Sequence, residues 1–205
     1  MSDFAALYLA HLNPMTLAHE TIIEKLRKDF VVYVFPVRFV KDGKEVNTRS
    51  FPFSYELRKR MVESVFGNSV QVLPDYTFES PYSQYLPPLL SSHSWKLRNK
   101  IASKVKEKRF VSYTGDRVER AMLRAYRLHP MKADRLDISA TSVREQMYMQ
   151  CQNGQANGDW RSLVPQSVAQ VIDENWSVVG AFSKERDRTK RVLGMKFPVD
   201  GYDRN

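Results

Sequence analysis

The sequence has only one cysteine, Cys151, among its 205 residues. A single thiol excludes a disulfide framework within the chain and any metal site built from several cysteines. Long apolar runs are also missing, since a stretch such as Phe30 to Val37 is far too short to cross a bilayer. The first three residues lack the basic and then apolar pattern of a signal peptide. We therefore expect a cytoplasmic protein that does not enter a membrane.

Acidic residues are too few to balance the basic ones. The chain has 32 Lys and Arg against 23 Asp and Glu, a formal charge of +9, which favours an anionic partner. Two partners fit: a nucleic acid spread over a wide basic face, or a small polyphosphate held in one pocket. Part of the excess lies between Lys184 and Arg191, where five of eight residues are basic. A solvated tail accounts for that part.

Apolar periodicity predicts a βαβ unit at the start of the chain. Residues 4–9 and 31–37 have the pattern of buried strands, and residues 16–26 that of an amphipathic helix. The alternation continues, with strands expected at 70–73 and 110–113 and helices at 54–66, 95–105, 118–128, 142–149 and 167–175. We expect Ser142 and Glu145 to form a capping box, and residues 77–88 to form a long loop. The predicted class is α/β with a parallel sheet, in one domain of residues 1–182 followed by a basic tail of residues 183–205.

The first candidate site is the turn after the first strand. In an open α/β sheet, ligands bind at the carboxyl ends of the strands. Thr16 and His19 lie three residues apart at a helix start, so both can face one ligand. Free amides and the helix dipole favour phosphate there, and a histidine can donate hydrogen bonds to a phosphoryl group. An ordinary helix cap with a surface histidine would give the same pattern.

A second candidate site lies at residues 138–144. Hydroxyl groups and an arginine gather at another predicted helix start, namely Ser139, Thr141, Ser142 and Arg144. Hydroxyls, free amides and a guanidinium together can clamp phosphate. A Ser/Thr-rich cap followed by a solvated arginine is the alternative.

These two segments resemble motifs of the nucleotidyltransferase superfamily. Residues 13–19 look like its (H/T)xGH motif, with Thr16 first and His19 last, and residues 138–144 look like its ISSTxxR motif. The resemblance covers roughly residues 4–175. It implies a Rossmann-like parallel sheet of about five strands with helices on both faces. It also implies nucleotidyl transfer from a nucleoside triphosphate to a small phosphorylated acceptor, with Mg²⁺ held mostly by the phosphates.

The resemblance also implies roles for single residues. His19 would stabilise the transition state, with Thr16 in place of the first motif histidine, and Lys41 would lie near the acceptor or the α-phosphate. The expected nucleotide-binding residues are His11, Asn13, Gly115, Asp116, Ser139, Thr141, Ser142 and Arg144. The other basic residues between Arg38 and Arg60 are expected mostly on the solvated face of a helix. No protein ligand for the metal is expected.

The sequence departs from the family pattern at two places. Ala18 replaces the motif glycine, which puts the close approach of the ligand in doubt, and Ala10 and His11 stand where many members have glycine and a small residue. His11 is either a ligand contact or a polar residue at a strand end.

The sequence leaves more than one substrate pair open. The segment from Trp160 to Ile172 resembles the C-terminal pattern of archaeal-type nicotinamide mononucleotide adenylyltransferases, which favours ATP with that acceptor; generic packing would give the same pattern. A CTP-dependent cytidylyltransferase acting on a phospho-alcohol or phosphonate is one rival. A non-catalytic module that binds nucleotides or nucleic acid is another, although no nucleic-acid recognition pattern stands out. We also expect a homo-oligomer.

Overall fold

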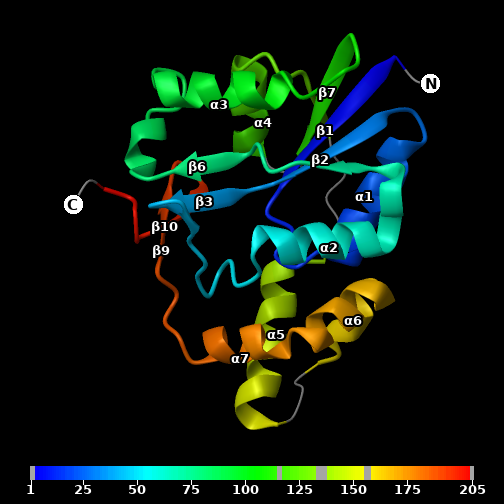
Figure 1. Cartoon of the computed structure of the whole chain (residues 1–205), viewed down its shortest axis with the longest axis vertical. Coiled ribbons are helices and arrows are strands. Elements are labelled where there is room, and N and C mark those ends of the chain that lie inside the picture. Colours follow the sequence, from blue (N-terminus) through cyan, green and yellow to red (C-terminus); the bar gives the residue numbers. More distant parts are fainter. Residues whose placement is uncertain (1–2, 115–116, 133–137, 155–157, 204–205) are drawn as a thin grey trace.

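The computed structural model describes residues 3–114, 117–132, 138–154 and 158–203. Its centre is a five-stranded sheet in the order β5-β2-β1-β7-β8, and every neighbouring pair is parallel. The strands are β1 (Phe4–Ala10), β2 (Val31–Pro36), β5 (Gln71–Val72), β7 (Arg109–Thr114) and β8 (Pro130–Lys132). The predicted parallel α/β sheet is therefore confirmed, and Figure 1 shows its helices around it.

Helices cover both faces of the sheet because the strand side chains alternate between two apolar clusters. Ala6 and Tyr8 of β1 pack with α1 (Leu17–Arg27) and α2 (Tyr55–Phe66). Ala5 and Leu7 point to the other face, where they pack with α3 (Ser92–Ala102) and α4 (Arg117–Ala125). Helices α5 (Ala140–Asn153), α6 (Gln166–Glu174) and α7 (Trp176–Ser183) extend the first cluster below the sheet (Figure 1). No helix among the described residues is long and apolar enough to cross a membrane.

A second, smaller layer of strands lies beside the carboxyl ends of the sheet. Strands β3 (Arg38–Lys41), β4 (Lys44–Glu45) and β6 (Thr77–Glu79) form a three-stranded sheet. Residues 77–88 were expected to form a long loop. This prediction was wrong, because they contain β6 and a 3₁₀ turn, η2 (Tyr82–Tyr85). Tyr82 and Tyr85 are buried in an aromatic cluster, and that packing gives the segment its regular structure.

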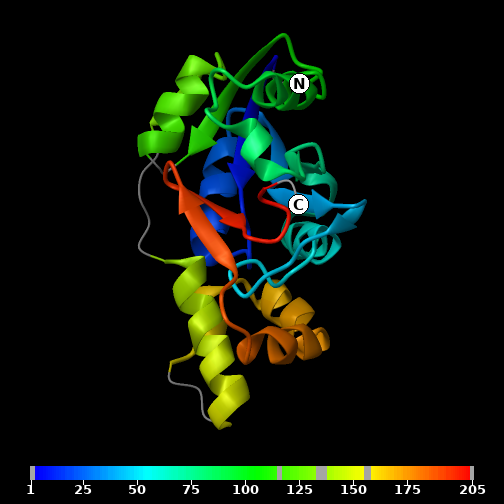
Figure 2. The ribbon, with the colours of Figure 1, turned by 90° about the vertical axis from the view of Figure 1, so that its left-hand side faces the viewer.

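The C-terminal residues form a second departure from the sequence prediction. Strands β9 (Thr189–Val192) and β10 (Met195–Pro198) form an antiparallel hairpin. It lies across from β1 in Figure 2, where the hairpin is orange-red and β1 dark blue. Phe197 of β10 is only 1% exposed, so the hairpin is anchored to the body of the protein, whereas the basic run before it, residues 184–188, is exposed as its charge suggested. The division of the chain at residue 183 stays a prediction.

Two further expectations need correction. Helix α5 begins at Ala140 and is capped by Ser139, whose Oγ accepts a hydrogen bond from the Thr141 N–H. Ser142 and Glu145 therefore lie inside the helix and form no capping box. Arg58 is not on a solvated face, because its guanidinium is buried and binds the carbonyls of His11 and Val37 and the Glu45 carboxylate. It thereby ties together the chain segments that leave β1 and β2.

Candidate nucleotide-binding site

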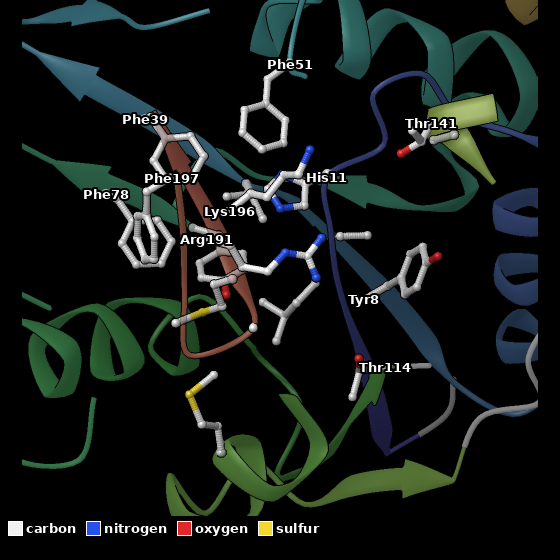
Figure 3. A pocket seen from close by; sticks show the side chains of 18 of the residues that line it. Tyr8, His11, Phe39, Phe51, Phe78, Thr114, Thr141, Arg191, Lys196 and Phe197 are labelled. Carbon is white, nitrogen blue, oxygen red and sulfur yellow. The ribbon is translucent and has the colours of Figure 1, made fainter. Parts of the chain in front are cut away.

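A cavity of about 470 Å³ opens at the carboxyl ends of β1 and β7. In the strand order of the sheet these two strands meet where the connections change direction, which is where α/β folds bind ligands. The floor is formed by Tyr8 to His11 and by Thr114, and the start of α5 forms one side. Strand β3 and the β9–β10 hairpin form the opposite side, so that Phe39, Phe78 and Phe197 face Thr141 across the cavity (Figure 3).

His19 lies beside this cavity, outside its lining, and Thr16 sets its tautomer. Thr16 is the N-cap of α1, and its backbone N–H donates to Nδ1 of His19 at 2.9 Å. The Thr16 hydroxyl lies 2.9 Å from the same nitrogen. Burial lowers the pKa of His19 to about 4, so the ring is neutral at pH 7. The His19 ring packs against Tyr8, which lines the cavity, with ring centroids 6.3 Å apart.

Asn13 positions the turn rather than reaching into the cavity. Its side chain is 1% exposed and exchanges two 3.1 Å hydrogen bonds with the backbone of Phe53. Its carbonyl accepts a hydrogen bond from Nη1 of Arg144. The two predicted motifs, which are more than 100 residues apart in sequence, are thus in direct contact through Asn13 and Arg144.

Arg144 is a buried cation at the cavity wall. It is 7% exposed, and its Nη2 donates to Oγ1 of Thr141 at 3.1 Å. No carboxylate among the described residues lies within ion-pair distance of it. Burial lowers the pKa of its guanidinium. The carboxylates of Glu145 and Asp187 act on it only from beyond ion-pair distance, and a buried cation with no close opposite charge favours an anion in the cavity.

His11 lines the cavity as a neutral ring. It stacks on Phe51 with centroids 4.5 Å apart and an interplanar angle of 11°. Its pKa is lowered to about 3, first by burial and then by the charges of Arg58, Arg144 and Lys196. It can therefore donate one hydrogen bond and accept another, but it brings no charge of its own.

The remaining predicted residues divide into those at the cavity and those away from it. Ser139 and Thr141 line it, whereas Ser142 is exposed outside the lining. Lys41 does not line it either and forms a 2.7 Å ion pair with Asp200, whose bond raises the lysine pKa. Gly115 and Asp116 lie outside the described residues.

Sequence reasoning missed two cations that the structure brings to the cavity. Arg191 and Lys196 come from the β9–β10 hairpin (Figure 3). Together with Arg144 they give the described lining three cations and no carboxylate. The basic residues near position 191 were visible in the sequence, but nothing there indicated that a hairpin would turn them toward β1.

The donors around the cavity do not make a protein cage for a metal ion. Among the described residues there is no group of three His, Cys, Asp or Glu side chains that could hold one. The hydroxyls and cations of the lining suit the phosphate groups of a ligand instead.

Three solved structures resemble the chain. One is a bifunctional nicotinamide mononucleotide adenylyltransferase/ADP-ribose pyrophosphatase from Francisella tularensis, with a TM-score of 0.62, 16% identity, and 89% of this chain and 53% of that chain covered. The same enzyme complexed with AMP and manganese has a TM-score of 0.55 and 16% identity, with 87% of this chain and 54% of that chain covered. A putative nicotinate-nucleotide adenylyltransferase from Vibrio parahaemolyticus has a TM-score of 0.51 and 16% identity, with 84% of this chain and 99% of that chain covered.

The fold is that of these adenylyltransferases. The expected Rossmann-like architecture, a parallel sheet with helices on both faces, is thereby confirmed. The chain spans about half the length of the two Francisella chains and nearly the whole of the Vibrio chain. No protein-family model matches the sequence, and no curated protein sequence matches it.

Proposed function

We propose that the chain is a nucleotidyltransferase that joins a nucleoside triphosphate to a small phosphorylated acceptor and releases pyrophosphate. The observation that carries this proposal is Arg144, a guanidinium 7% exposed that lines the cavity with no carboxylate partner among the described residues. A triphosphate supplies the missing negative charge. The start of α5 supports the same position, because free amides and the helix dipole favour anions.

His19 would act on the reacting phosphate as a neutral donor. A backbone N–H can only donate, so the bond from Thr16 to Nδ1 leaves the histidine proton on Nε2. In the proposed reaction an acceptor phosphate oxygen attacks the α-phosphorus. The bond to the β-phosphate breaks, and pyrophosphate leaves with the electron pair. No general base is needed, because the attacking oxygen is already ionised. Nε2–H stabilises the charge that develops on the phosphoryl oxygens.

Mg²⁺ would enter with the triphosphate. Since the described residues offer no carboxylate cage, the phosphate oxygens would supply most of its ligands, as is common for this ion. When bound it would neutralise phosphate charge. Arg144 and Thr141 would then orient the β and γ phosphates, and Ser139 would add a hydroxyl at the helix start.

ATP with nicotinamide mononucleotide is the substrate pair that we favour. The functions named for the similar structures and the motif resemblance support it. The segment from Trp160 to Ile172 supports it less than its sequence suggested, because Trp160 is buried and stacks on Trp176. Packing of the core accounts for that pattern. A CTP-dependent cytidylyltransferase remains the rival enzyme.

The test is pyrophosphate release by the purified chain with Mg²⁺ and ATP or CTP. Nicotinamide mononucleotide, glycerol 3-phosphate and phosphocholine would serve as acceptors. We expect a dinucleotide from ATP and nicotinamide mononucleotide, and strong rejection of the other triphosphate, because unpaired buried polar groups disfavour the wrong base. Turnover with CTP alone would overturn the base assignment, and no turnover with any pair would overturn the proposed activity.

The non-catalytic alternative has its own signature. If the +9 charge serves nucleic-acid binding, affinity for an oligonucleotide should fall steeply with salt as counterions are released. Binding of Mg-ATP in one pocket should depend on salt much less. Tight oligonucleotide binding with a steep salt slope, without turnover, would favour the binding module.

A further inference from the structure

The β9–β10 hairpin places two cations directly opposite each other. Its strands are joined by Leu193 and Gly194, whose φ angles of 49° and 83° are those of a type I′ turn. This turn sets the register in which Arg191 is the cross-strand partner of Lys196. Directly opposed residues of an antiparallel pair share one face, and like charges there repel. Both residues line the cavity, so an anion bound between them would relieve the repulsion.

Contacts with the rest of the protein hold the hairpin in place. Phe197 is buried in the aromatic cluster with Phe39 and Phe78. Beyond β10, the carbonyls of Gly201 and Tyr202 accept 2.9 Å hydrogen bonds from the N–H groups of Tyr82 and Ser83. The positions of the two cations are therefore set by contacts with the body of the protein.

The two cations differ in the partners that the protein gives them. Nζ of Lys196 lies 2.9 Å from the Ser50 hydroxyl and 3.4 Å from the Asp187 carboxylate. Arg191 has no hydrogen-bond or ion-pair partner among the described residues, and its guanidinium extends from the hairpin toward β1 (Figure 3). Arg191 is itself exposed, so that water solvates its charge, and among the described residues it is the cation of this wall that the protein leaves without a partner.

Cations reach the cavity from two sides, and the charges of both sides act on His11, whose pKa is lowered by Arg144 and by Lys196. Arg144 and Thr141 mark the end at α5, where the triphosphate is proposed to bind. Arg191 and Lys196 mark the end beside His11 and the phenylalanine side chains of Figure 3. Phe39, Phe78 and Phe197 are only 4%, 7% and 1% exposed, so a ligand on this side would meet mainly the two cations, which suit a phosphate group.

We propose that Arg191, supported by Lys196, binds the phosphate of the acceptor. This inference rests on the proposed function, and it assigns the C-terminal hairpin a direct part in acceptor recognition. It places the acceptor phosphate between Arg191 and the α-phosphate that it attacks.

The experiment compares the wild type with Arg191→Gln, Arg191→Lys and the control Arg186→Gln. Arg186 is exposed and does not line the cavity, so its substitution removes the same charge elsewhere in the C-terminal segment. The probes are nicotinamide mononucleotide for turnover and Mg-ATP for calorimetric binding. Arg191→Gln should raise the KM for nicotinamide mononucleotide by ~10- to 100-fold, the loss of one charge-assisted hydrogen bond. The Kd of Mg-ATP should stay within about two-fold, because the triphosphate lies at the other end.

Arg191→Lys should recover part of the loss because it keeps the charge without the planar fork, and Arg186→Gln should match the wild type. An unchanged KM in Arg191→Gln, or an equal loss of Mg-ATP affinity, would overturn the inference and leave the proposed function standing. Failure of the wild type to turn over any triphosphate would instead overturn the proposed function, and the inference with it.

Discussion

Thr16 donates its backbone N–H to Nδ1 of His19 over 2.9 Å. This bond selects one tautomer of the neutral ring and leaves Nε2–H available to a ligand. The capping geometry at the start of α1 therefore also prepares a hydrogen-bond donor beside the cavity. In the proposed reaction this donor would serve a phosphoryl group.

The first prediction concerns that donor. His19→Ala should lower kcat by ~10²-fold or more while leaving the Kd of Mg-ATP nearly unchanged, because the bond strengthens in the transition state. The matched control is His93→Ala, an exposed histidine that does not line the cavity. Steady-state kinetics on folded variants provide the measurement. An unaltered kcat in His19→Ala would remove His19 from the reaction.

The second prediction concerns Arg144. Arg144→Ala should weaken Mg-ATP binding by ~10- to 100-fold and affect acceptor KM much less, because the guanidinium faces the proposed triphosphate end. Arg144→Lys should recover only part of the affinity. Calorimetry gives both values, with Arg124→Ala as a control on an exposed helix position. Equal affinities of the wild type and Arg144→Ala would contradict the assignment.

The third prediction is a pH dependence of stability. His11 and His19 have folded-state pKa values of about 3 and about 4, below the value near 6.5 of an unfolded chain. Between these values the unfolded state binds more protons, so the free energy of unfolding falls as pH drops below about 6.5. Each histidine should contribute about 1–2 kcal/mol of this fall, after allowance for its partial contact with solvent.

Urea unfolding at pH 7 and pH 4.5 measures this effect. His11→Phe keeps a flat ring against Phe51 and removes one titrating group. The difference in stability between the two pH values should therefore be smaller in this variant than in the wild type. An identical pH dependence would show that His11 titrates normally.

The fourth prediction tests how the hairpin is fixed. Gly201 has φ +82°, and an added Cβ would lie 3.1 Å from Oγ of Ser80 and 3.2 Å from Cε2 of Tyr82. Gly43 has a similar φ of +75°, but nothing among the described residues lies within 4 Å of its Cβ position. Gly43→Ala should therefore cost only the backbone penalty of about 1–2 kcal/mol. Gly201→Ala should cost more and should also raise acceptor KM, because it displaces the segment that holds β10.

Urea unfolding and steady-state kinetics on the two glycine variants check this prediction. Equal losses of stability, with acceptor KM unchanged in both, would mean that the contact of Gly201 with Ser80 and Tyr82 does not position the hairpin.

The sequence predicted the sheet because its strands and helices carry periodic apolar patterns. Residues 4–9 and 31–37 match β1 and β2 closely, and Ser54 caps α2 as expected. Its Oγ accepts from the Leu57 N–H, a local interaction that needs no knowledge of the rest of the chain. Contacts between residues that are close in the sequence can thus be predicted from the sequence alone.

The parts that sequence did not predict depend on distant partners. Strands β9 and β10 contain many charged residues, and they are ordered by Phe39, Phe78 and η2 far earlier in the chain. Arg58 stands in a basic run, and its burial follows from Glu45 and two carbonyls. A charge count cannot separate such residues from solvated ones. For the same reason the sequence did not indicate that Arg191 would line the cavity, or that Lys41 would pair with Asp200 outside its lining.

The docking of the hairpin also bears on the order of folding. The hydrogen bond from Lys41 to Asp200 joins residues 159 positions apart, whereas β1 and β2 are joined through one helix. Closing so long a loop costs about 4 kcal/mol of chain entropy, which is recovered only once the aromatic cluster has formed. We therefore expect a refolding chain to regain its central sheet before the wall that carries Arg191. Recovery of ligand binding would then lag behind recovery of the sheet.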